Sequence, residues 1–575
     1  MFLRCRKVGL YSVLAVLTAG LLACGQEAPQ VAPEPEYVEG ELILKFSKQM
    51  PSTAIEQALS PRGLSITKQV DELGIVVARV GEGVMMSAAM ERLESDPNIE
   101  YVEPNYIYHT MVTPNDPRYN ELWGMRMIDA PQAWDQQTGS ESVIVGIIDT
   151  GINYEHEDLA ANMWRNPGES GDGKENNGVD DDNNGFVDDV FGWDFVNDDN
   201  DPRDDNDHGS HVSGTVGAVG NNGKGVVGVN WNVRLMALKF LDANGSGSTA
   251  DAVDAIIYAT NMGAKVLNNS WGGGGRSRAL EDAIRFANER GVLFVAAAGN
   301  AASDNDTFPS YPASYDLPNV VAVAASTEND GLASFSNFGR HTVHLAAPGT
   351  NILSSVSGGG YNSFNGTSMA TPHVAGAAAL VWAQFPGRSM NQIKIRLLGS
   401  VERNGTFADR VTTGGRLNVN DALSTSPLIH TRRLDDTTNE QGPYVVLADA
   451  VDDSRVEAVT LTYQVDSQAP VTVDMTPQGN DRYLAEIPGQ SLGSNITYSV
   501  TARDDQGNET RGREISFRIG ESEEPPDGGI CGQSAGEVSL EHRGVQTAVN
   551  ASLNLLIFVL PIAALGWRAR RRRER

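Results

Sequence analysis

Ser368 lies in the stretch NGTSMATPHVAG at residues 365–376, where a serine follows a glycine turn and precedes small side chains. Small residues of this kind let a helix lie buried close to its neighbours. If that helix begins at Ser368, the hydroxyl and the first backbone N–H groups lie at the positive end of the helix dipole, where developing negative charge is favoured. Such a serine can act as a nucleophile only if other residues help it. The rest of the chain must therefore supply a histidine, a carboxylate and an oxyanion donor.

The elements that would position these groups alternate between residues 114 and 425. Continuous apolar runs of strand length occur at residues 142–148, 234–240, 265–267, 292–298 and 320–324. Residues 249–262 and 278–290 carry apolar side chains at helical spacing, and Gly291 follows the second segment as a helix stop. This alternation predicts an α/β domain with a parallel sheet covered by helices on both faces. Catalytic residues should then gather at the carboxyl ends of the strands.

Three polar residues meet this expectation. Asp149 ends the first apolar run in IIDTG, Asn300 ends the segment AAAGN, and His208 lies in DHGSHVSGT, where glycines permit a tight approach before a helix. Together with the stretch around Ser368, these segments resemble the motifs of the subtilisin-like serine peptidases, in the same Asp, His, Ser order. A single Asp-Thr-Gly would be weak evidence, but four motifs in the right order are specific.

The resemblance implies a role for each residue. Ser368 would be the nucleophile, and His208 would take its proton, because histidine is the side chain whose ordinary pKa suits that transfer near pH 7. Asp149 would hold the imidazole in the productive tautomer and stabilise the imidazolium. The Ser368 N–H and the Asn300 side-chain amide would bind the oxyanion. His211 and His373 lie in the same motifs, and His156 lies nearby; we expect all three to be packed structural residues.

Substrate-binding residues can also be carried over from the resemblance. Ser270, Trp271 and Gly272 lie in NSWGG, which resembles the edge segment along which a peptide adds as a strand in this family. Ser310 matches a small residue bordering the primary specificity pocket, which would leave room for large apolar or aromatic side chains. The expected substrates are proteins and peptides, cut with broad specificity.

An acidic insertion between the Asp and His motifs predicts a Ca²⁺ site. The spacing of Asp180, Asp182 and Asn184, followed by Gly185, places three oxygen ligands on one side of a tight loop, as in an EF-hand. The match is incomplete, because Phe191 stands where a terminal glutamate would be expected. Asp188 or Asp189 could close the site, and a solvated acidic loop is the alternative.

A second Ca²⁺ site is suggested by resemblance alone. Residues 220–226, GNNGKGV, resemble the calcium loop that follows the catalytic histidine in subtilisins, with Asn222 in the loop and Asp158 as the remote carboxylate. Lys224 and the extra glycines depart from the usual pattern of that loop.

Two further units flank the predicted peptidase domain. Residues 37–110 alternate short strand-like and helix-like segments, a small α+β unit that resembles the inhibitory propeptide of the family. It would template folding, occupy the cleft as an intramolecular inhibitor, and be removed near residues 108–113; a permanent accessory domain is the alternative. Residues 427–520 carry short alternating strands separated by turns, which predicts a β-sandwich of immunoglobulin or fibronectin-III type.

The two ends of the chain predict export and attachment. Residues 1–24 combine basic residues, an apolar run and the sequence LLAC, which resembles a lipoprotein signal with a lipid on Cys24. Residues 25–36 and 521–547 are expected linkers, and residues 548–575 join an apolar run to six arginines, as in a membrane anchor or a C-terminal sorting signal. We therefore expect a secreted or envelope-attached protein of a bacterium, of Gram-negative type.

Charge and cysteine usage limit the possible functions further. The formal net charge of −30 argues against nucleic acid as a partner. With three cysteines, one of them inside the signal, no disulfide framework is expected. An active, self-processing serine endopeptidase is the favoured hypothesis. A dedicated processing peptidase with few targets is compatible with the same residues, and the alternative from another class is a catalytically silent surface scaffold that keeps the fold.

Overall fold

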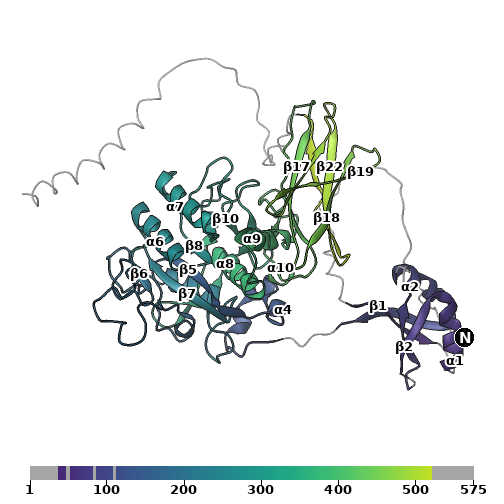
Figure 1. The fold of residues 1–575 in the computed structure, drawn as a ribbon, viewed down its shortest axis with the longest axis horizontal. Helices are drawn as coiled ribbons and strands as arrows, with labels where there is room; N and C mark the ends of the chain where they lie inside the picture. Colours follow the sequence, from purple (N-terminus) through teal and green to yellow (C-terminus); the bar gives the residue numbers. More distant parts are fainter. Residues whose placement is uncertain (1–36, 47–51, 71, 82–85, 108–111, 521–575) are drawn as a thin grey trace, which may run out of the picture.

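The computed structural model describes residues 37–46, 52–70, 72–81, 86–107 and 112–520. Within them the chain forms a small α+β unit, a parallel-sheet domain and a β-sandwich, in that order (Figure 1). The expected signal, the linkers at residues 25–36 and 521–547, and the tail at residues 548–575 lie outside the described residues. Among the helices that are described, none combines the length and apolarity needed to cross a membrane.

The N-terminal α+β unit is a four-stranded antiparallel sheet in the order β2-β3-β1-β4, covered by two helices. The sequence pattern predicts all of its elements except β2, a strand at the edge of the sheet. In Figure 1 this unit, in purple, lies apart from the parallel sheet. Its elements are β1 (Tyr37–Phe46), α1 (Ser52–Leu59), β2 (Leu64–Val70), β3 (Ile75–Val80), α2 (Met86–Glu94) and β4 (Ile99–Tyr106).

The central domain is built on a nine-stranded sheet in the order β14-β15-β11-β10-β9-β8-β5-β7-β6. All its pairings are parallel except that of β14 with β15. The strands are β5 (Gly139–Asp149), β6 (Gly192–Asp194), β7 (Asn232–Lys239), β8 (Val266–Asn269), β9 (Leu293–Ala297), β10 (Val320–Ser326), β11 (Leu345–Pro348), β14 (Glu402–Arg403) and β15 (Gly415–Arg416).

Helices cover both faces of this sheet. Successive residues of β5 point to opposite faces, so Ile147 packs in one core with α5 and α8, whereas Ile148 packs in a second core with α6 and α7. This confirms the predicted fold class. The helices are α3 (Trp123–Met127), α4 (Ala130–Trp134), α5 (His208–Gly217), α6 (Thr249–Asn261), α7 (Arg278–Glu289), α8 (Thr367–Gln384), α9 (Met390–Gly399) and α10 (Val419–Ala422). A two-stranded sheet, β12 (Ile352–Ser355) with β13 (Tyr361–Phe364), precedes α8.

The C-terminal unit is a sandwich of two antiparallel sheets around its own core, as the alternating pattern predicts. One sheet has the order β16-β17-β21-β20, and in the other β19-β18-β22-β23 is joined by β24 at β22. Figure 1 shows α9 between this sandwich and the parallel sheet, and β16 and β17 contact α9. The strands are β16 (Leu428–Thr431), β17 (Tyr444–Val451), β18 (Val456–Val465), β19 (Val471–Asp474), β20 (Thr476–Gly479), β21 (Arg482–Ile487), β22 (Asn495–Asp504), β23 (Glu509–Arg511) and β24 (Ile515–Arg518).

Candidate active site

Asp149 and His208 meet at the carboxyl edge of the sheet. Asp149 is the last residue of β5 and is fully buried, and His208 is the first residue of α5. The Asp149 Oδ1 atom lies 2.7 Å from His208 Nδ1 and also accepts a hydrogen bond from the Thr150 N–H at 2.8 Å. A neutral imidazole that donates from Nδ1 presents an unprotonated Nε2, which is the atom that can accept a proton.

Two glycines allow the strand end and the helix start to approach this closely. A Cβ atom on Gly209 would lie 2.0 Å from the carbonyl oxygen of Gly151, and a Cβ on Gly151 would lie 2.5 Å from the Pro202 carbonyl. Gly151 also has φ of +106°, a conformation that other residues rarely adopt. The glycines that flank the Asp and His motifs are therefore steric requirements of the Asp149–His208 contact.

Asp204 and Thr150 fix the first turn of α5. The Thr150 hydroxyl donates to Asp204 Oδ1 and accepts from the Gly209 N–H, and Asp204 Oδ2 accepts from the Ser210 N–H, all at 2.8 Å. These bonds satisfy N–H groups that an N-terminal helix turn leaves free, and they tie the helix to the end of β5. Our sequence analysis did not single out Asp204, whose signal is an acidic residue four positions before the motif histidine.

The charge of Asp149 controls the proton affinity of His208. Burial lowers the pKa of His208, but the negative charge of Asp149 and its hydrogen bond outweigh burial, and the net pKa lies above the ordinary value. Within the part of the chain that the structure describes, His211 and His373 have no carboxylate partner, and burial lowers the pKa of each to about 4. Of these three histidines, only His208 has a pKa that suits proton exchange near neutral pH.

Helices α5 and α8 run side by side in the same direction. Near their starts, the His211 ring stacks on Phe364 with centroids 4.4 Å apart. Further along, the Asn230 amide donates to the carbonyl oxygens of Val216 and Gly376, at 3.2 and 2.8 Å. Val216 follows His208 by as many residues as Gly376 follows Ser368. The parallel helices therefore bring His208 and Ser368 to the same end of the pair.

Ser368 occupies the first turn of α8, with Thr367 as the first helical residue. Its hydroxyl donates to the carbonyl oxygen of Ser270 at 2.9 Å, and the Ser270 hydroxyl donates back to the Ser368 carbonyl at 2.8 Å. Because the hydroxyl donates to Ser270, its proton must leave that carbonyl oxygen before it can be given to His208.

Asn300 lies beside the start of the same helix. Its Oδ1 atom accepts from the Thr367 N–H at 2.9 Å and from the Thr367 hydroxyl at 3.0 Å. The amide oxygen is thus held by the residue before Ser368, while the side chain as a whole is exposed. This leaves the Nδ2 hydrogens of Asn300 available to an external oxygen at the helix N-terminus.

The predicted substrate-binding residues lie on three converging segments. Ser270 directly follows β8, and the Gly273 N–H donates to the Tyr311 carbonyl at 3.0 Å. A Cβ on Gly272 would lie 4.0 Å from Ser310 Oγ, and one on Gly299 would lie 3.2 Å from the same atom. Trp271 packs against Phe240, with ring centroids 4.8 Å apart. Ser310 therefore lies close to both the segment after β8 and the segment after β9.

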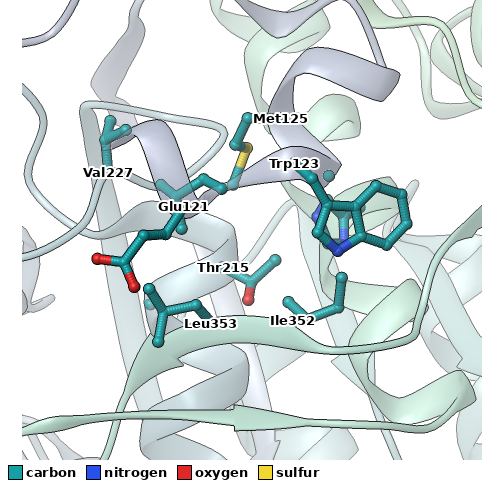
Figure 2. A pocket seen from close by; sticks show the side chains of 11 residues that line it. Glu121, Trp123, Met125, Thr215, Val227, Ile352 and Leu353 are labelled. Atoms are coloured by element: carbon teal, nitrogen blue, oxygen red, sulfur yellow. The ribbon is translucent and has the colours of Figure 1, made fainter. Parts of the chain in front are cut away.

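Three other histidines near the site have structural contacts, as predicted. His211 Nε2 lies 2.8 Å from the Ile352 carbonyl, and His373 Nδ1 lies 2.8 Å from the Met369 carbonyl. His156 accepts from the Asp158 N–H at 3.1 Å. His373 also lines a cavity of about 10 Å³, which Figure 2 shows among Trp123, Thr215 and Ile352. Such a volume holds at most one water molecule, so this cavity is not a substrate site.

The acidic insertion gathers a different set of carboxylates from the expected one. Ligand oxygens of Glu169, Asp182 and Asp189 lie within 4.8 Å of one another. Glu169 is fully buried and its Oε2 atom has no hydrogen-bond partner in the described residues. Burial raises the pKa of Asp189 to about 6. A buried carboxylate oxygen without a partner, beside two further carboxylates, is the chemistry of a hard-cation site.

Asp180 and Asp188, which also belong to the expected EF-hand-like set, accept hydrogen bonds from the backbone of the loop. Asp180 accepts from the N–H groups of Asn184 and Gly185, and Asp188 accepts from those of Asn177 and Gly178. The amide nitrogen of Asn184 donates to Asp189 Oδ2 at 2.9 Å, so this side chain joins the cluster through its nitrogen. The structure therefore separates Asp182, which joins the cluster, from Asp180 and Asp188, which shape the loop.

The second expected site brings together Asp158 and the loop at residues 220–226. Asp158 accepts from the Asn222 amide and from the Val226 N–H, each at 2.9 Å. Asp116, which the sequence analysis did not include, accepts from the Asn221 N–H at 2.7 Å. Burial and the charge of Asp158 raise the pKa of Asp116. Two carboxylates thus face the same loop.

Comparisons with known proteins agree with this geometry. A family model described as the subtilase family matches residues 140–422, and one described as the fervidolysin N-terminal prodomain matches residues 26–105. The thermophilic serine proteinase of Bacillus sp. (strain AK1) is 38% identical over 363 residues, 63% of this chain and 81% of that protein. Thermitase of Thermoactinomyces vulgaris is 38% identical over 299 residues, 51% of this chain and 95% of that protein. The halolysin-like extracellular serine protease Nep of Natrialba magadii is 34% identical over 433 residues, 73% of this chain and 74% of that protein.

A parallel sheet with an aspartate, a histidine and a serine at its carboxyl edge defines the catalytic class of a serine hydrolase. The chain belongs to the subtilase family and is a serine endopeptidase that carries an N-terminal prodomain. The alternative of a catalytically silent scaffold is not favoured by these relatives.

Proposed function

We propose that this endopeptidase cuts peptide bonds with Ser368 as nucleophile, His208 as general base and Asp149 as the residue that orients His208. The 2.7 Å contact between Asp149 and His208, at the end of a helix parallel to the one that carries Ser368, supports this assignment. Ser368 Oγ would attack the scissile carbonyl carbon while its proton passes to His208 Nε2. The same nitrogen would then give the proton to the leaving amine, and water would hydrolyse the acyl-enzyme by the same steps.

The oxyanion of each tetrahedral intermediate would be bound by the Ser368 N–H and the Asn300 Nδ2 hydrogens. The bonds from Thr367 to Asn300 Oδ1 support this role, because they fix the amide before substrate arrives. A donor that is already oriented stabilises developing charge without further reorganisation. Loss of one such donor costs about 10²- to 10³-fold in kcat, which is the effect expected for Asn300→Ala.

A covalent probe of serine nucleophiles tests the assignment of Ser368. A fluorophosphonate should label the processed enzyme once, and Ser368→Ala should abolish both labelling and peptide hydrolysis. Ser491→Ala is the control, since Ser491 is an exposed residue of the sandwich and this variant should keep full labelling. Labelling of Ser368→Ala at the wild-type rate would assign the nucleophile elsewhere.

We propose that substrates bind as an added strand along residues 270–272, with the side chain before the scissile bond lying beside Ser310. Gly272, Gly299 and Ser310 lie close together and carry no bulky side chain, which supports this position for the substrate side chain. Large apolar or aromatic residues are the proposed preference. A library of peptides that differ only at that position would reveal a preference for small or charged residues instead.

We propose that the prodomain blocks the cleft until the enzyme cuts its own chain near residues 108–113. The match of residues 26–105 to a prodomain model supports the first part. After such a cut, a lipid on Cys24 would hold only the prodomain. The proposed segment at residues 548–575 would then decide whether the mature enzyme stays on a Gram-negative bacterial envelope or leaves it.

We further propose that Ca²⁺ stabilises the peptidase domain. Glu169, Asp182 and Asp189 would hold one ion in the acidic insertion, and Asp116 and Asp158 would face a second at the loop of residues 220–226. The unpartnered oxygen of Glu169 is the observation that supports the first site. Bound there, the ion would offset the repulsion among buried carboxylates and hold the insertion on the end of the sheet.

A further inference from the structure

A large cavity lies between the peptidase domain and the β-sandwich, beside α9. Its volume is about 660 Å³, within the usual range for small-molecule sites. The peptidase domain contributes residues 313–318, residues 340–344, Thr412 and part of α9. The sandwich contributes His430, residues 432–433, Asp449 and Arg482. We call this space the interdomain cavity.

The walls of the interdomain cavity are cationic in a strongly acidic chain. The chain has a net charge of −30, yet the charged lining residues are five cations and two aspartates. Three of the nine histidines of the chain also line the cavity. The ionised lining residues are Arg340, Lys394, Arg432, Arg433, Arg482, Asp316 and Asp449, and the histidines are His341, His344 and His430.

Three of the cations have carboxylate partners. Arg482 contacts Asp449 at 2.9 Å, and Arg433 contacts Asp409 at 2.7 Å. Arg340 lies 3.8 Å from Asp435, which also contacts His341. The Nε atoms of Arg340 and Arg433 are nevertheless buried without a hydrogen-bond partner in the described residues.

Lys394 and Arg432 have no carboxylate partner within the described chain. Lys394 Nζ donates to the carbonyl oxygens of Pro318 and Val320, at 3.0 and 2.7 Å. His344 Nδ1 accepts from the Ala322 N–H, so the neutral ring carries its proton on Nε2, only 3.4 Å from Lys394 Nζ. This wall therefore presents hydrogen-bond donors and positive charge together.

The positive charges that line the cavity repel one another. Burial and the charge of Arg432 lower the pKa of Lys394 to about 8. Burial, followed by the charges of Lys394 and the arginines around it, lowers the pKa of His430 to about 3. A bound counter-charge would remove this repulsion and would use the unpaired donors.

We propose that the interdomain cavity binds a ligand with two or more carboxylate or phosphate groups, with Lys394 and Arg432 as its main cationic partners. Such a ligand would contact α9 and the sandwich at once and so hold the two domains together. Two sources of this chemistry exist: a free small polyanion, or the acidic sequence ESEEPPD at residues 521–527 of this chain. That sequence follows Gly520, whose N–H donates to the Thr437 carbonyl close to Asp435.

Calorimetry on the full-length chain with Ser368→Ala tests the proposal, since this change prevents self-cleavage. The probes are succinate, a dicarboxylate, and inorganic sulfate, a dianion shaped like phosphate, both in excess Ca²⁺. Acetate at matched ionic strength is the control ligand. At least one dianion should bind with one-to-one stoichiometry and a Kd below about 1 mM, and added salt should weaken it.

Charge-removing variants locate the binding. Arg432→Met should weaken dianion binding about ten-fold, the effect of losing one charged hydrogen-bond partner. Arg503→Met is the matched control on β22, where Arg503 pairs with Glu457 at 3.2 Å, and it should bind as before. Lys394→Met is a second test, but its lost bonds to Pro318 and Val320 make Arg432→Met the deciding variant. Equal binding by Arg432→Met would overturn the proposal.

A third variant separates the two sources of the anion. Glu521→Gln, Glu523→Gln and Glu524→Gln together remove three charges from the chain's own acidic segment. Tighter dianion binding by this variant would identify the segment as the competing ligand, and unchanged binding would identify a free polyanion. If neither this variant nor its parent binds either dianion, the interdomain cavity is not an anion site.

Discussion

The contact between Asp149 and His208 sets the chemistry at the scale of single residues. Burial alone would leave His208 like His211 and His373, whose pKa burial lowers to about 4. A base with that pKa would be neutral at pH 7 but too weak to take a serine proton efficiently. The carboxylate of Asp149 instead raises the pKa of His208. Contact with an acid therefore distinguishes His208 from His211 and His373.

We predict that kcat/KM falls as pH decreases through the pKa of His208. Protonated imidazole cannot accept the Ser368 proton, so activity is lost on the acid side. Because the pKa of His208 is raised above 6.5, half-maximal kcat/KM should occur above about pH 6.5. A pH profile on a neutral peptide substrate measures this midpoint, and a flat profile down to about pH 4 would exclude His208 as the base.

The Asp149→Asn variant serves as the control for that profile. It keeps the shape of the side chain but removes the charge that raises the pKa, while burial still lowers it. The midpoint should therefore move to lower pH, and kcat should fall by about 10⁴-fold. An unchanged midpoint would mean that another group titrates.

The sequence singles out Asp149, His208 and Ser368 because each lies in a short segment with its own chemistry. It does not reveal Asp204, whose carboxylate joins Thr150, just after β5, to Ser210 in α5. A carboxylate that bonds both a helix start and a strand end has no fixed sequence separation from both partners. A sequence pattern therefore cannot identify it. Only the folded chain shows that this residue positions His208.

At the scale of elements, the acidic insertion shows that the spacing of acidic residues in the sequence does not fully predict which of them come together. The pattern of Asp180, Asp182 and Asn184 predicts a calcium loop, but Asp180 accepts hydrogen bonds from the loop backbone and only Asp182 joins the carboxylate cluster. Yet Glu169 lies well before the pattern, and its burial could not be anticipated from local sequence. The three-residue edge strand β6 is missed for a related reason, because its partner β7 is distant in the chain.

We predict that chelation of Ca²⁺ lowers the Tm of the processed enzyme by a few degrees. An ion that binds the folded state alone stabilises it by mass action, about 2.7 kcal/mol at one hundred times its Kd. Glu169→Gln should start at a lower Tm in Ca²⁺ and should lose less on chelation. Scanning calorimetry with and without chelator measures both quantities.

Asp172→Asn provides a matched control in the same insertion. Asp172 is exposed and has φ of +54°, a conformation that asparagine also accepts, so this variant should respond to chelator as the wild type does. Identical responses from wild type and Glu169→Gln would remove Glu169 from the calcium site. If chelator changes the Tm of neither the wild type nor the two variants, calcium does not stabilise this domain.

At the scale of the whole molecule, three units have separate cores but shared function. The sequence predicts each unit from its own periodicity, because burial within a unit depends on local pattern. The arrangement of the units is different, since it depends on surfaces that meet only after folding. The interdomain cavity combines Arg340, Lys394 and Arg432, which lie on three distant segments. No local charge pattern could indicate that they face one space.

Self-cleavage also depends on the arrangement of the units, because the end of the prodomain must reach the catalytic residues for the chain to cut itself. In Figure 1 the prodomain lies apart from the parallel sheet, and β4 ends at Tyr106 shortly before the proposed cleavage region. We predict that Ser368→Ala remains an uncut precursor, whereas the wild type acquires a new N-terminus near residues 108–113. Mass spectrometry of the intact protein and of both its ends measures this directly.

The Asn300→Ala variant tests the same cleavage through its rate. If the chain's own oxyanion site performs the cut, this variant should still mature, but about 10²- to 10³-fold more slowly than the wild type. The rate should not change on dilution if the cut is intramolecular, because both partners belong to one chain. Maturation of Ser368→Ala at the wild-type rate would instead assign the cut to another protease, while leaving Ser368 as the nucleophile toward external substrates.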